Sequence, residues 1–191
     1  MRWTILLLSV GALLSVSARA QLKAKLPTAP ATPPWNKGIQ PISRESYWNA
    51  IECGKQAGTR PACVFYDAEL CANEDFVLTF FTPYKMVAYE VWQTVRRKQP
   101  APTPDYGAAQ RIRITLGITP AKGSHNPITA VAIKRDRRVV KPATQSVDDT
   151  GGRFIFDFAA LAPTSGIAIE LIGRTGTRTC LVDPDVLKSF R

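Results

Sequence analysis

The chain is predicted to be mainly β, with helices near its N-terminus and an antiparallel β-sandwich over residues 106–191. Apolar residues recur at helical spacing between residues 44 and 98. From Arg111 onward they instead alternate with polar residues, beginning with Ile112 and Ile114. Short alternating segments separated by Gly, Pro and Asp turns are typical of an antiparallel sandwich. A glycine fingerprint between a strand and a helix is absent, which argues against a nucleotide-binding fold.

Residues 1–20 have the composition of a secretory signal. A basic start at Arg2 precedes an apolar run too short to span a membrane, and the segment ends in Ala18-Arg19-Ala20. The mature chain is therefore expected to begin at Gln21, to be secreted or periplasmic, and to contain no membrane span. Residues 21–41 are rich in proline and are expected to form an extended tether.

The next segment, residues 42–105, is expected to be helical and rich in cysteine. Ser43 suits the N-cap of a helix over residues 44–53, and Gly54 suits the left-handed position after its end. Thr82 followed by Pro83 indicates the start of a second helix. We expect the second helix to continue to residue 98. Two further elements are expected before it, a helical turn over Asp67–Ala72 and a strand over residues 76–81.

Six short strands are expected to build the sandwich domain, residues 106–191. Turn residues separate them, among them Asp136-Arg137 and the stretch Asp148–Gly152. The expected strands are residues 112–118, 128–133, 139–140, 154–158, 167–171 and 179–182.

Within this domain, the stretch FDFAALAPTSGIAIELIG, from Phe156 to Gly173, has a strand, a short turn with Leu and Pro, and a second strand. This order resembles the E-to-F region of immunoglobulin-like sandwiches. The resemblance implies an immunoglobulin-like architecture. The corner tyrosine and core tryptophan of true immunoglobulin domains are absent from the expected places, so the resemblance concerns architecture and names no family.

The four cysteines are predicted to form two structural disulfides. Their spacing lacks the close pairs of zinc ribbons and redox motifs, and the chain has a single histidine, so no metal site and no cofactor is expected. Four cysteines allow three pairings. Every pairing connects the last strand to the helical segment. The cysteines are Cys53, Cys63, Cys71 and Cys180.

The formal net charge is +10, and most of the excess lies in residues 111–191. A basic surface attracts anionic polymers or acidic proteins. The predicted export argues against nucleic acid as a partner and favours an acidic envelope protein or an anionic polymer. The densest basic cluster flanks a predicted hairpin, and its alternating side chains fall on two strand faces. We expect a binding site there, or charges that prevent edge pairing. The cluster consists of Lys134, Arg135, Arg137, Arg138 and Lys141.

No set of residues with the spacing of a catalytic site is evident. His125 lies in a polar loop beside Ser124, and loop neighbours rarely point at each other as a nucleophile and its base must. Acidic pairs could serve a glycosidase or bind calcium, but each lies beside turn residues. No catalytic residue is therefore assigned. The acidic pairs are Glu74-Asp75, Asp148-Asp149 and Asp183-Asp185.

These observations predict an exported, non-catalytic binding or structural module of the cell envelope or extracellular space. One alternative is a secreted hydrolase that uses acidic residues with or without His125. A second alternative is a polyanion-binding module. An enzyme would bring His125 or an acidic pair into a cleft with other polar groups, whereas a binding module would display an apolar or basic patch.

Overall fold

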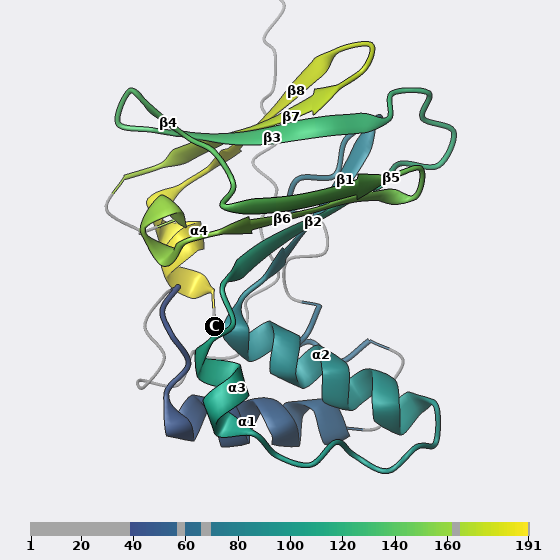
Figure 1. Cartoon of the computed structure of the whole chain (residues 1–191), viewed down its shortest axis with the longest axis vertical. Helices are drawn as coiled ribbons and strands as arrows, with labels where there is room; N and C mark the ends of the chain where they lie inside the picture. The colour runs from purple at the N-terminus through teal and green to yellow at the C-terminus, as the bar shows by residue number, and fades with distance from the viewer. Residues whose placement is uncertain (1–38, 57–59, 66–69, 162–164, 191) are drawn as a thin grey trace, which may run out of the picture.

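The computed structural model describes residues 39–56, 60–65, 70–161 and 165–190. Its main body is a sandwich of two antiparallel four-stranded sheets (Figure 1). One sheet, sheet A, has the strand order β1-β2-β6-β5, and the other, sheet B, has the order β4-β3-β7-β8. The prediction of a mainly β chain with an antiparallel sandwich is confirmed. The strands of sheet A are β1 (Phe76–Phe81), β2 (Ile114–Pro120), β5 (Thr144–Asp148) and β6 (Gly151–Phe156), and those of sheet B are β3 (Ile128–Arg135), β4 (Arg138–Val140), β7 (Ile167–Gly173) and β8 (Thr177–Val182).

The core lies between the two sheets because every second side chain points inward. Strands β1, β2 and β7 alternate buried and half-buried residues over most of their length. Phe154 and Phe156 of sheet A and Ile133 and Ile169 of sheet B are fully buried in the same cluster. This apolar layer holds the sheets together and fixes the register of their strands.

Two features of the sandwich differ from the expected strands. The strand expected over residues 154–158 ends at Phe156, and a 3-10 helix, η1 (Phe158–Leu161), follows it. Strand β5 was not expected at all. All of its residues are exposed, so it has no alternation of apolar and polar positions that a sequence pattern could reveal.

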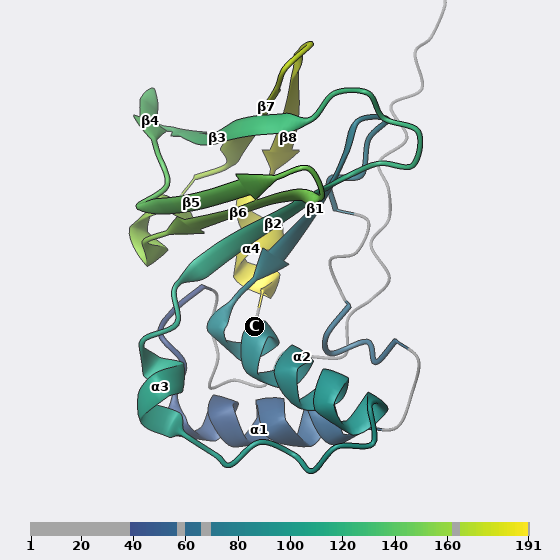
Figure 2. The same cartoon turned by 45° about the vertical axis from the view of Figure 1, so that its right-hand side comes forward.

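The helices α1, α2 and α3 form a second layer beneath the sandwich, as Figure 2 shows most clearly, whereas Leu187 of α4 is buried in the core of the sandwich. The helices α1 and α2 pack along each other and have an apolar cluster of their own, centred on Ala50, Val87 and Val91. The remaining helices are short and were not expected, since fewer than two turns give no clear periodicity. The helices are α1 (Arg44–Lys55), α2 (Pro83–Arg96), α3 (Tyr106–Gln110) and α4 (Pro184–Ser189).

The expected helix starts are confirmed, but one expected helix end is wrong. The side chains of Ser43 and Thr82 cap α1 and α2, as predicted. Gly54, however, lies inside α1 and does not terminate it. A Cβ atom at this position would lie 2.5 Å from the carbonyl oxygen of Ala88 in α2. The glycine therefore allows close packing between two helices.

The helical layer and the sandwich are connected through β1. This strand belongs to the segment expected to be helical, yet it pairs along its whole length with β2. The expected division between residues 42–105 and 106–191 stays a prediction. Sheet A contains strands from both sides of it, since β1 pairs with β2. The predicted signal, most of the predicted tether, and the first half of the turn expected over Asp67–Ala72 lie outside the described residues.

Both disulfides form, as predicted. Cys53 pairs with Cys63 within the helical layer, and Cys71 pairs with Cys180 of β8. The second bridge spans 109 residues and attaches the segment before β1 to the last strand of sheet B. Two structural disulfides are typical of an oxidising compartment outside the cytoplasm. Across the described part of the chain, no helix is both long and apolar enough to cross a membrane.

Candidate functional site

The predicted basic hairpin forms, and its tight turn determines which basic residues lie opposite each other. β3 and β4 are joined by two residues, Asp136 and Arg137, whose φ angles are +47° and +63°. Two central residues with positive φ are typical of a type I′ turn, whose twist matches that of a hairpin. Arg135 and Arg138 therefore lie opposite each other across the hairpin.

Two of the five basic side chains are engaged by groups of the protein itself. The Nζ atom of Lys134 lies 2.6 Å from an Oε1 atom of Glu170 on the neighbouring strand β7. Arg135 donates from Nη1 to the carbonyl oxygen of Ala159, and its Nε lies 3.3 Å from the carboxylate of Asp136. Both cations thus hold the hairpin to the sandwich, which the sequence pattern did not reveal.

The other three cations are Arg137, Arg138 and Lys141. Within the described residues, none of their side chains has a hydrogen-bond or ion-pair partner. Uncompensated charges at a surface attract anionic groups. These three side chains are therefore the part of the predicted cluster that is available to a partner.

A concave surface of about 740 Å³ lies beside the hairpin. It includes three of the five predicted residues, Arg135, Arg138 and Lys141, whereas Lys134 and Arg137 are not part of its lining. The carboxylates of Asp136 and Asp157 also line it, and Asp157 lies 3.7 Å from the guanidinium of Arg113. The surface therefore combines free positive charge with paired charge, and small apolar side chains complete it. These are Val140, Ala143, Ala159 and Ala160.

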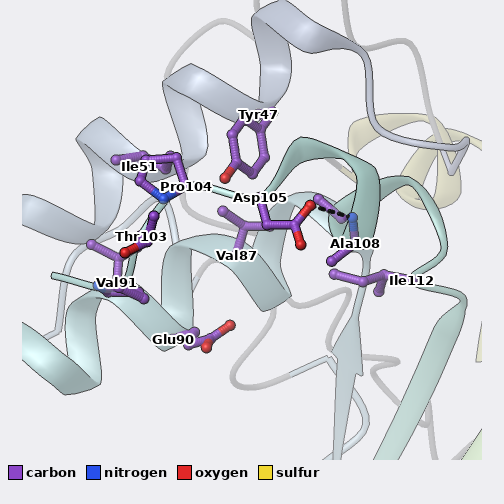
Figure 3. A pocket seen from close by; sticks show the side chains of 12 residues that line it. Tyr47, Ile51, Val87, Glu90, Val91, Thr103, Pro104, Asp105, Ala108 and Ile112 are labelled. Atoms are coloured by element: carbon purple, nitrogen blue, oxygen red, sulfur yellow. Dashed lines mark hydrogen bonds between the residues drawn. The ribbon is translucent and has the colours of Figure 1, made fainter.

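A second cavity, of about 210 Å³, lies among the helices (Figure 3). Tyr47 of α1 and Val91 of α2 line it, and Glu90 lies on the side away from Tyr47. The Asp105 carboxylate accepts a hydrogen bond from the Ala108 amide, 2.8 Å away, and so caps α3. The Asp105 carboxylate at this cavity is thus used as a helix cap.

A polar cluster around the buried side chain of Asn126 holds the loops at one end of the sandwich. Asn126 is 4% exposed and donates from Nδ2 to Asp75 and to the Gly176 carbonyl, while its Oδ1 accepts from the Thr175 amide. Arg178 donates from Nε to Asp75. The hydrogen bond from Asn126 and the guanidinium of Arg178 lower the pKa of the Asp75 carboxyl from its ordinary value. The sequence did not indicate this cluster, since its members come from three distant segments.

Of the residues considered for catalysis, Ser124 and Asp75 meet in the polar cluster around Asn126, where a side-chain hydrogen bond from Ser124 also lowers the pKa of the Asp75 carboxyl. His125 is exposed, and the Oγ atom of the neighbouring Ser124 accepts a hydrogen bond from the Asn126 amide. Asp148 accepts hydrogen bonds from the amide and hydroxyl of Thr150 and so closes a turn. In the described part of the chain, no group of three His, Cys, Asp or Glu side chains is placed to hold a metal ion. Asp148 thus has a local structural role, whereas Glu74 and Asp75 pair with the distant Arg178 of β8.

No protein-family model matches the chain, and neither the curated proteins nor the solved structures contain a significant match to it.

Proposed function

We propose that the chain is an exported, non-catalytic binding module whose hairpin surface binds an acidic protein segment. The observation that carries this proposal is the group of three uncompensated cations, Arg137, Arg138 and Lys141, at or beside a concave surface. Export is proposed from the signal-like residues 1–20, and the two disulfides support it. The proposed location is the periplasm or the extracellular space.

The surface chemistry favours an acidic protein over a uniformly charged polymer. A polyanion is best matched by a continuous basic stripe. Here two of the predicted cations are held by Glu170 and Asp136, and small apolar side chains line the same surface as Arg138 and Lys141. A segment that carries both carboxylates and small apolar side chains matches this mixture better.

An immunoglobulin-like architecture is proposed for the scaffold. In immunoglobulin constant-type domains, one sheet holds strands A, B, E and D and the other holds C, F and G. The order β1-β2-β6-β5 corresponds to A-B-E-D, and β3-β7-β8 corresponds to C-F-G, with β4 as an added edge strand. The segment from β6 through η1 to β7 passes from one sheet to the other, which supports the E-to-F resemblance of the sequence.

The proposal can be tested with a labelled peptide of alternating Glu and Leu, by fluorescence anisotropy. The triple variant Arg137→Ser, Arg138→Ser, Lys141→Ser should bind about tenfold or more weakly than the wild type, since it loses three uncompensated charges. A matched control removes three exposed cations elsewhere, through Arg97→Ser, Lys122→Ser and Arg174→Ser, and should bind within about twofold.

Two outcomes would contradict the proposal. Equal losses in both triple variants would mean that net charge alone drives binding. Tighter binding of dextran sulfate than of the peptide, with the same dependence on the hairpin, would favour the polyanion-binding alternative.

A further inference from the structure

A groove of about 320 Å³ lies between helix α2 and the outer face of sheet A. It is separate from the hairpin surface, and the two share no lining residue. Its apolar part comes from both layers of the fold. Phe81 and Ile155 belong to strands β1 and β6, and Met86 and Tyr89 belong to α2. All four of these side chains are half-buried, so the groove offers apolar surface that the protein itself leaves open to solvent.

The apolar floor of the groove is held in a fixed shape. The ring of Phe81 lies over β2 because Gly117 has no side chain, and a Cβ atom there would lie 3.0 Å from the ring. The rings of Phe81 and Tyr89 meet edge to face, with centroids 5.7 Å apart. Gln93 donates from Nε2 to the hydroxyl of Tyr89 at 2.7 Å, which fixes the phenol. A preformed apolar surface of this kind lowers the entropy cost of binding a ligand.

One charge of each sign lines the groove, and the Nζ atom of Lys85 lies 5.3 Å from the centroid of the Phe81 ring. Glu90 on α2 and Arg153 on β6 both line it, and both are exposed. Among the described residues, neither side chain has a hydrogen-bond or ion-pair partner, and the two do not pair with each other. The carboxylate and the guanidinium are therefore both available to a ligand in the same groove.

We propose that this groove binds a zwitterionic small molecule with an apolar body, namely a free hydrophobic amino acid. Its carboxylate would pair with Arg153, its ammonium with Glu90, and its side chain would lie on Phe81 and Tyr89. The volume is at the lower end of small-molecule pockets, which suits a ligand of this size. A ligand with a single charge would leave one of the two protein charges without a partner.

The proposal is tested by titrating the full chain with L-phenylalanine, L-leucine and L-methionine and following amide shifts by NMR. Two analogues of phenylalanine dissect the charges: phenylalaninamide lacks the carboxylate, and 3-phenylpropionate lacks the ammonium. At least one of the three amino acids should bind saturably in the millimolar range or tighter. If phenylalanine binds, each analogue should bind about tenfold more weakly, since each loses one charge-assisted contact.

Two variants test which residue contacts each charged group of the ligand. Arg153→Gln should weaken the amino acid that binds about tenfold and leave phenylalaninamide unchanged. Glu90→Gln should weaken the same amino acid about tenfold and leave 3-phenylpropionate unchanged. Both residues are exposed, so the variants are expected to fold, and circular dichroism checks this. No saturable binding of any of the three amino acids at 20 mM (roughly the upper limit of weak small-ligand affinity), or binding that neither variant changes, would overturn the proposal.

Discussion

Arg178 of β8 donates a hydrogen bond from Nε to an Oδ2 atom of Asp75, 2.7 Å away and 103 residues earlier in the chain. Its guanidinium also pairs with Glu74. Two residues further along β8, Cys180 forms the disulfide to Cys71. The segment before β1 is therefore attached to the last strand twice, once by a covalent bond and once by charge. Because β1 belongs to sheet A and β8 to sheet B, both links hold the two sheets together at the same place.

The charge link predicts a loss of stability in acid. The pKa of Asp75 is lowered in the folded chain from its ordinary value of 3.8, first by the hydrogen bond from Asn126 and then by Arg178. A lowered folded-state pKa contributes stability above the unfolded-state pKa, and this contribution disappears as the pH falls through the folded-state value. Asp75→Asn should therefore be less stable than the wild type at pH 7, and the difference should shrink below about pH 4.

Urea unfolding at a series of pH values measures this difference. Asp149→Asn is the control, because Asp149 is an exposed residue of a turn. It should be about as stable as the wild type at pH 7, because an exposed charge contributes little to stability. A gap between the wild type and Asp75→Asn that stays constant from pH 7 to pH 2 would contradict the assignment.

The covalent link predicts an order among the cysteine variants. In the chain-entropy model, a bridge stabilises by restricting the unfolded chain, and the effect grows with loop length. Replacing Cys71 and Cys180 by Ser should cost about 5 kcal/mol, whereas replacing Cys53 and Cys63 should cost about 3 kcal/mol. The sequence separations are 109 and 10 residues. Urea denaturation of both double variants provides the comparison, and a larger loss for the short bridge would show that local packing dominates.

Alanine is usually more stable than glycine inside a helix, but at Gly54 we expect the opposite. Gly54→Ala would place a Cβ atom against the Ala88 carbonyl and the Val91 side chain, so α1 and α2 must move apart. The expected loss is about 1–3 kcal/mol. Gly107→Ala in α3 is the matched control, since its added Cβ would meet its nearest neighbour at 3.4 Å. The control should be neutral or stabilising by up to about 1 kcal/mol. Similar effects of both variants on the thermal midpoint would refute close packing at Gly54.

Much of the fold could be predicted because the patterns are local. Strand β1 coincides with the run FVLTFF, and Thr82-Pro83 marks the start of α2. β5 could not be predicted, since all of its side chains are exposed and it forms only through pairing with β6. The role of Gly54 could not be predicted for a different reason: its neighbour Ala88 lies on another helix, which the local sequence does not show.

The residues of the candidate site could be predicted from the sequence, but their contacts could not. The basic cluster and its hairpin turn are legible in the sequence. Lys134 pairs with Glu170, and Arg135 donates a hydrogen bond to the Ala159 carbonyl. Both partners are brought close only by the folding of the sandwich, so the sequence does not show these contacts. The groove beside α2 depends on the same kind of distant contact, since Phe81 and Ile155 belong to strands that are separated by β2.

Export predicts the N-terminus of the mature protein. If residues 1–20 act as a signal, the protein recovered from the periplasm or the medium of an expressing cell begins at Gln21. Intact-mass measurement of that fraction identifies the first residue. Recovery of the full chain, with Met1 retained, in the cytoplasm alone would remove the basis for the proposed location.

The salt dependence of binding to the acidic Glu-Leu peptide tests the central claim most directly. Contacts between protein cations and anionic groups release counterions, so affinity falls with salt in proportion to the number of such contacts. The account predicts a steep fall for the wild type and a clearly shallower one for the variant lacking Arg137, Arg138 and Lys141, with the control triple variant matching the wild type. Parallel slopes for the wild type and the hairpin variant would show that these residues do not contact the acidic partner, and would contradict the account.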